Sequence, residues 1–170
     1  GVSQSAYRVV VATSPEQLEA GNADVWNSGR IKSGDQTVVC SPAAPLKSHT
    51  RYFWKVETWD DNGRMPVTTP VSWFETGKMT PGEWKAQWIT DSHDEQYKPA
   101  PMFRREFATG KQIASARAYI CGLGYYELYL NGERVGDHLL DPGYTDFSKR
   151  VLYVTYDITA QLGEGKNCIG

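Results

Sequence analysis

Apolar and polar residues alternate at every second position in several short stretches of the chain, and helical spacing is scarce. Tyr7, Val9 and Val11 share one face of the segment 6–12, and the segment 52–59 alternates in the same way. This pattern is typical of a half-buried strand with one wet face. Further strands are predicted at 71–75, 102–108, 116–121, 125–130, 151–156 and from 166 onward. The sequence therefore predicts an all-β protein.

Turn residues separate these strands and sharpen the prediction. Asn131-Gly132 lies between two alternating segments, and this dipeptide favours a type I′ hairpin turn because both residues tolerate positive φ. Gly122 and Gly124 precede another alternating segment and are interpreted as a bulge or tight bend rather than as a nucleotide-binding loop, since no helix follows them. Asp157 is expected to cap a short turn that runs to residue 162.

One local motif indicates a particular kind of sandwich. Leu46, Thr50 and Tyr52 follow the pattern L-x-x-x-T-x-Y directly before a strand. This resembles the tyrosine corner of fibronectin type III and immunoglobulin-like domains, in which the phenol hydroxyl binds the backbone a few residues upstream. The segment 1–77 is therefore predicted to be a fibronectin type III/Ig-like sandwich. It is expected to be incomplete and to lack its first strands, because only four or five of about seven can be placed.

Pro81-Gly82 indicates a linker over 78–83. The segment 84–170 then forms a second β-sandwich, which is expected to be truncated at its C-terminus because the sequence stops within a predicted strand.

Composition and charge exclude several classes of function. The net charge is −2 and no basic block is longer than two residues, so no nucleic-acid partner is expected. No run of about 18 apolar residues occurs, so no membrane span is expected. Cys40, Cys121 and Cys168 lie far apart, without the spacing of a zinc or redox motif, and are interpreted as small buried apolar residues in strands. The compartment stays open, with a periplasmic or extracellular location favoured slightly over a cytoplasmic one.

Few residues are candidates for a catalytic, metal-binding or ligand-binding site. The three histidines are isolated, so no metal site is predicted, and no cofactor motif or catalytic residue is identified. Asp141, Tyr144 and Asp146 combine an aromatic ring with two carboxylates in a predicted loop, which are the ingredients of a sugar-binding site. The alternative for Tyr144 is that its ring packs against a neighbouring domain or its own sheet.

The second module carries a resemblance to a known family. The run ARAYICGLGYYELYLNGERVG at 116–136 and the run LDPGYTDFSKRVLYVTYDIT at 140–159 resemble the N-terminal β-sandwich domain of bacterial α-L-rhamnosidases. The runs SAYRV at 5–9, WNSG at 26–29 and TRYFWKV at 50–56 resemble the opening region of the same family. Shorter pieces of the second module are also similar to galactose-binding-like jelly-roll sandwiches.

The resemblance implies a non-catalytic accessory region of an enzyme that hydrolyses terminal α-L-rhamnosides with inversion. The catalytic acids would lie in a separate (α/α)6 barrel, which this chain is expected to support or to assist in substrate recognition. Rhamnose-containing glycans would be partners through the whole enzyme. Two alternatives remain at this stage: a free-standing carbohydrate-binding module and a protein-interaction module of the fibronectin type.

Overall fold

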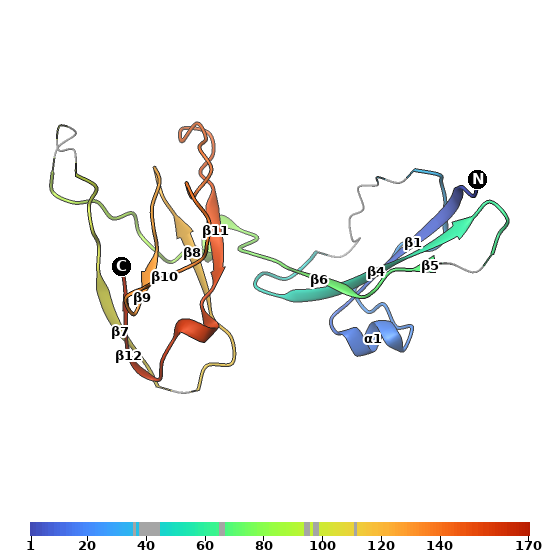
Figure 1. Cartoon of the computed structure of the whole chain (residues 1–170), viewed down its shortest axis with the longest axis horizontal. Helices are drawn as coiled ribbons and strands as arrows, with labels where there is room; N and C mark the ends of the chain where they lie inside the picture. The colour runs from blue at the N-terminus through green and yellow to red at the C-terminus, as the bar shows by residue number, and fades with distance from the viewer. Residues whose placement is uncertain (36, 38–44, 65–66, 94–95, 97–98, 111) are drawn as a thin grey trace. The chain divides into compact units, whose positions relative to one another are not determined.

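The computed structural model describes residues 1–170 except 36, 38–44, 65–66, 94–95, 97–98 and 111. The chain divides into two compact units, Gly1–Ala86 (unit 1) and Gln87–Gly170 (unit 2) (Figure 1). Both are built from antiparallel strands, so the all-β prediction is confirmed. Among the described residues, no helix is long and apolar enough to cross a membrane.

Unit 1 contains one antiparallel sheet, with two long strands at its centre. The strands β1 and β4 pair along eight registered positions, β2 and β3 pair with β1, and β5 and β6 pair with β4. The elements are β1 (Gln4–Ala12), α1 (Pro15–Glu19), β2 (Trp26–Asn27), β3 (Ile31–Lys32), β4 (Arg51–Asp60), β5 (Val67–Thr68), β6 (Ser72–Glu75) and a 3-10 helix η1 (Pro81–Glu83).

The short helix α1 was not predicted from the alternating pattern. Its Leu18 is buried with Val10 and Ala12 of β1, and the ring of Phe53 packs against this cluster. A signal for the helix does exist in the sequence. Ser14 accepts a hydrogen bond from the Gln17 backbone N–H at 3.3 Å, and proline follows the serine in the first turn, as is common at helix starts.

The tyrosine corner is confirmed. The Lys47 backbone N–H donates to the Tyr52 hydroxyl at 2.9 Å, five residues upstream of the tyrosine. The Tyr52 ring is buried and lies 5.5 Å from the Phe74 ring, centre to centre. The hydroxyl therefore fixes the 46–50 segment to the start of β4 while the ring packs between β4 and β6.

The predicted linker 78–83 is ordered against the end of unit 1. The Glu83 carboxylate accepts hydrogen bonds from the Ser48 hydroxyl at 2.6 Å and the Met79 backbone N–H at 3.0 Å. The hydrogen bond from Ser48 lowers the pKa of the Glu83 carboxyl below its ordinary value. These hydrogen bonds attach Met79 and Glu83 to the turn at Ser48. Unit 1 ends three residues after Glu83, at Ala86.

Unit 2 consists of two sheets that share one core. A four-stranded sheet has the order β10-β9-β12-β7, and a two-stranded sheet pairs β11 with β8. Core residues come from both sheets and their connections: Ala118, Leu128, Leu130, Val135, Tyr156 and Ile158. The elements are β7 (Arg105–Thr109), β8 (Arg117–Cys121), β9 (Tyr129–Leu130), β10 (Glu133–Arg134), β11 (Tyr153–Asp157), a 3-10 helix η2 (Thr159–Gln161) and β12 (Gly165–Ile169).

The predicted hairpin at Asn131-Gly132 is confirmed. Both residues have positive φ, 54° and 87°, and Leu130 pairs with Glu133 across the turn. The strand before it is shorter than predicted. Only 129–130 belongs to β9, because the Tyr126 backbone pairs instead with Asp141 in the connection between β10 and β11.

Asp157 binds the start of the 3-10 helix η2, as expected. Its carboxylate accepts a hydrogen bond from the Thr159 backbone N–H at 3.0 Å.

A buried asparagine holds the last turn of the chain to the sheet. Asn167 in β12 is 2% exposed. Its amide nitrogen lies within hydrogen-bond distance of Thr109 Oγ1 and of the Gly163 and Gly165 carbonyls, at 2.9–3.2 Å. Its amide oxygen accepts from the Gly163 N–H and from the Asn131 side chain, both at 2.9 Å. One side chain thus satisfies the polar groups of the 163–165 turn and connects them to β7 and the hairpin.

Two of the three cysteines lie in strands, as expected, but each is half-buried rather than fully buried. Cys121 in β8 and Cys168 in β12 are free thiols. Burial raises the pKa of the Cys121 thiol, and Cys168 Sγ accepts a hydrogen bond from Arg104 Nε at 3.0 Å. Cys40 lies outside the described residues.

Candidate functional site

The three residues predicted to bind sugar lie in the connection between β10 and β11, which Figure 1 shows as a coiled excursion beyond the ends of β8 and β11. The connection is attached to the body of unit 2 at Asp141. The Tyr126 backbone N–H donates to the Asp141 carbonyl at 3.0 Å, and the two residues form an isolated antiparallel bridge. This bridge places the 121–126 segment beside residues 140–142.

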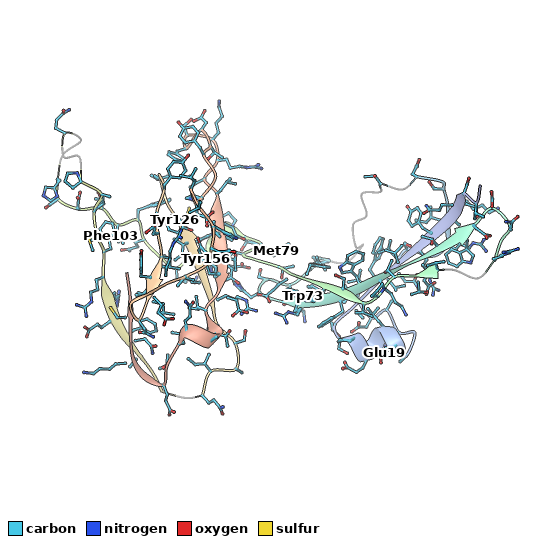
Figure 2. The ribbon with its side chains drawn as sticks, in the orientation of Figure 1. Glu19, Trp73, Met79, Phe103, Tyr126 and Tyr156 are labelled. Atoms are coloured by element: carbon cyan, nitrogen blue, oxygen red, sulfur yellow. The ribbon has the colours of Figure 1, made fainter. Side chains whose placement is uncertain are left out.

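The Asp141 side chain belongs to a network of polar groups. The Tyr156 hydroxyl donates to Asp141 Oδ2 at 2.6 Å, and the same oxygen lies 3.1 Å from His138 Nδ1. The hydroxyls of Tyr126 and Tyr156 are 3.2 Å apart, and Figure 2 shows the two labelled rings within unit 2. Asp141 therefore connects its own loop to β11 and to the segment before β9.

The network keeps its phenols protonated. Burial raises the pKa of Tyr156 far above its ordinary value, and the hydrogen bond to the Asp141 carboxylate raises it further because the phenol donates the proton. Burial also raises the pKa of Tyr126. These phenols serve as neutral hydrogen-bond donors near pH 7, which is the behaviour of a structural anchor.

This protonation gives a testable dependence on pH. Because the pKa of Tyr156 is higher in the folded than in the unfolded chain, its contribution is complete below pH 10 and is lost as the pH rises further. The free energy of unfolding of unit 2 should fall above pH 10, the ordinary pKa, by up to about 1.4 kcal/mol per pH unit. Urea unfolding between pH 8 and 11.5 measures this slope, and Tyr156→Phe should make it shallower. An unchanged slope in Tyr156→Phe would contradict the assignment.

The other two predicted residues have separate surroundings. The Asp146 carboxylate accepts from the Ser148 backbone and hydroxyl at 3.1 and 2.6 Å and pairs with Lys149 Nζ at 2.8 Å. The contact with Lys149 lowers the pKa of Asp146. Tyr144 is 80% exposed, and its ring lies 5.5 Å from the Phe147 ring. Asp141 thus binds Tyr156 of β11, whereas Asp146 binds residues of its own loop, and the sugar-binding interpretation stays a prediction.

Hydrogen bonds from neighbouring side chains lower the pKa of four carboxyl groups, those of Glu16, Asp24, Glu83 and Asp146. Among the described residues, no three His, Cys, Asp or Glu side chains gather around one point.

Exposed apolar side chains gather around the anchored loop. Five of them, each more than half exposed, come from the 122–125 bend and the 139–144 stretch that the Tyr126–Asp141 bridge brings together. We call this set the apolar rim: Leu123, Tyr125, Leu139, Leu140 and Tyr144. Large apolar side chains exposed on neighbouring segments are typical of an interaction surface.

Sequence reasoning identified Asp141 but missed its partners. Tyr126 lies in the connection between β8 and β9, His138 in the same connection as Asp141, and Tyr156 in β11. The usable signal was the alternation of the 151–156 strand, which places Tyr156 among inward-facing positions.

Two models of known protein families match this chain. Residues 1–80 match the model of the Rha78A-like N-terminal immunoglobulin domain, and residues 111–170 match that of the α-L-rhamnosidase N-terminal domain. A relative from Formosa agariphila, named α-L-rhamnosidase, is 40% identical over 192 residues that include this whole chain and 20% of the relative.

This chain consists of the N-terminal domains found in α-L-rhamnosidases.

Solved structures of the family have the same fold. The α-L-rhamnosidase from Dictyoglumus thermophilum superposes with a TM-score of 0.89 at 42% identity, over 99% of this chain and 21% of the rhamnosidase. The α-L-rhamnosidase from Aspergillus terreus gives 0.74 at 30% identity, over 99% and 19%. The chain therefore spans about one fifth of the length of these α-L-rhamnosidases and corresponds to their N-terminal domains.

Proposed function

We propose that this chain is the non-catalytic accessory region of an α-L-rhamnosidase that hydrolyses terminal α-L-rhamnosides with inversion of configuration. The observation that carries the proposal is the coverage: nearly all of this chain matches only about one fifth of each rhamnosidase.

The role of the region is to support the catalytic part of the enzyme. The apolar rim supports this, because a row of exposed Leu and Tyr side chains is stabilised when another protein surface covers it. The Tyr156–Asp141 bond holds the rim in one conformation before contact, which lowers the entropy lost on docking. Tyr144 would then be a packing residue, the alternative that the sequence already offered.

One experiment with three proteins tests the proposal. The 170-residue chain should not release 4-nitrophenol from 4-nitrophenyl α-L-rhamnoside. A protein of the relatives' full length that carries this chain as its N-terminal region should release it, with β-L-rhamnose as the first sugar seen by NMR. The same full-length protein with Leu140→Ser and Tyr144→Ser should lose activity at a lower temperature, because the rim no longer packs.

The control for the third protein replaces two exposed valines of unit 1, Val2→Ser and Val67→Ser, which should leave the inactivation temperature unchanged. Turnover by the 170-residue chain alone would overturn the non-catalytic assignment. Equal inactivation temperatures for the rim variant and the unchanged full-length protein would overturn the supporting role of the rim.

A further inference from the structure

Trp73 differs from the other aromatic residues of unit 1. It lies in β6, as Figure 2 labels it, and is 55% exposed. The other aromatic side chains that the structure describes in unit 1 are buried or half-buried. A large ring exposed on a regular strand has no role in the core of its own unit, so its function lies in what it can contact.

The surroundings of this ring are charged and ordered. The Arg51 guanidinium carbon lies 4.1 Å from the Trp73 ring centre, and Arg51 Nη2 is 3.2 Å from Glu75 Oε2. Register explains the cluster, because Arg51 stands opposite Glu75 and Phe53 opposite Trp73 on paired strands. The four side chains therefore lie on the same face of the sheet.

The other cation–tryptophan pairs of unit 1 do not offer such a surface. Arg30 lies over Trp59 at 4.6 Å, and Lys78 lies over Trp84 at 5.1 Å. Both of these rings are half-buried. Trp73 thus combines an exposed ring with a neighbouring donor and acceptor of opposite charge.

The size and polarity of this surface fit a small polar ligand better than a protein. One indole ring offers roughly 150–250 Å² of contact, whereas a stable protein interface covers about 800 Å² on each partner. A pyranose ring has an apolar C–H face that can lie on an indole, and hydroxyl groups at its edge that can accept from a guanidinium and donate to a carboxylate. Because Arg51 and Glu75 balance in charge, a neutral sugar is favoured over an acidic one.

We propose that Trp73, Arg51 and Glu75 form a shallow binding site for a neutral pyranose. The choice of an α-L-rhamnoside as the first ligand rests on the proposed function, but the site itself is argued from its own geometry. The face of the Trp73 ring that is turned away from the Arg51 guanidinium contacts the sugar. The ion pair holds both polar groups in place, so little side-chain freedom is lost on binding. With one ring and no enclosing walls, the dissociation constant should be on the order of millimolar.

Indole N–H resonances of the 170-residue protein test the proposal. The chain has six tryptophans, and the Trp73 resonance is assigned by its absence in Trp73→Phe. Titration with methyl α-L-rhamnoside to 50 mM should shift this resonance, and Arg51 and Glu75 backbone amides should shift with it. Binding should be about tenfold weaker in Trp73→Ala, as measured from the shifts of the Arg51 and Glu75 backbone amides. Methyl α-D-glucoside serves as a second neutral pyranose, and methyl α-D-glucuronide as its acidic counterpart that should bind less well.

The matched control is Tyr144→Ala, which removes an exposed aromatic ring of unit 2 from the other predicted sugar site. It should leave the titration unchanged. No shift of the Trp73 resonance at 50 mM, or a titration lost in Tyr144→Ala but kept in Trp73→Ala, would overturn the proposal. Neither result bears on turnover by the full-length protein, so failure of this site is distinguishable from failure of the proposed function.

Discussion

Replacing Asn167 with alanine is expected to lower the free energy of unfolding of unit 2 by about 3 kcal/mol. The substitution leaves the Gly163 N–H without its acceptor and removes one of the two acceptors of the Asn131 amide. The Gly163 and Gly165 carbonyls lose the Asn167 amide and keep only the Thr109 hydroxyl as a side-chain donor. Each buried polar group that loses its partner costs about 1–3 kcal/mol, and the turn can recover part of that cost by exposure to water.

Hydrogen exchange of the β12 amides measures the effect, because they pair with β7 and belong to unit 2 alone. Tryptophan fluorescence follows unit 1 in the same sample, since five of the six tryptophans lie there, and it should not change. Lys166→Ala, one residue away and exposed, is the matched control and should have an effect below about 0.5 kcal/mol. Equal effects of the two substitutions would contradict the role of the Asn167 amide.

Replacing Asp141 with alanine should destabilise unit 2 by about 2 kcal/mol and release the 137–152 connection. The Tyr156 hydroxyl loses its acceptor at 2.6 Å, and the hydrogen bond between the two phenols loses the group that polarises it. Asp141→Asn should cost less, because its amide oxygen can still accept from Tyr156. Exchange of the Tyr126 amide, which donates to the Asp141 carbonyl, should accelerate most in Asp141→Ala.

Asp146→Ala provides the comparison within the same loop. This carboxylate is half-exposed and pairs with an exposed lysine, so its removal should change the stability far less than Asp141→Ala does. If Asp141→Ala and Asp146→Ala had the same effect on Tyr126 exchange, the polar network would not be the anchor of the loop.

The features that sequence predicted correctly are local ones. The Asn131-Gly132 turn follows from two adjacent residues that tolerate positive φ, and the Tyr52 corner spans only five residues. The strands around residues 4–12 and 51–60 follow from alternation alone. Such signals depend on backbone preferences, which act over a few residues.

The features that sequence missed depend on contacts between distant segments. Asp141 was singled out as a sugar ligand because carboxylate and ring were adjacent in sequence, but its hydroxyl donor is Tyr156, fifteen residues away in another element. Asn167 was predicted only as part of the strand from 166 onward, and its partner Asn131 is 36 residues away. The spacing of residues along the sequence does not give a side chain's partner across a sheet, because that partner depends on how the strands pair.

The position of β12 has a consequence for synthesis of the protein. The last strand of the chain lies between β9 and β7 in the four-stranded sheet, so neither neighbour has this partner until residues 165–169 have left the ribosome. Unit 1 has no such dependence on unit 2 strands and can acquire its β1–β4 pairing earlier. A nascent chain halted near residue 160 should therefore carry a folded first half and a protease-sensitive second half.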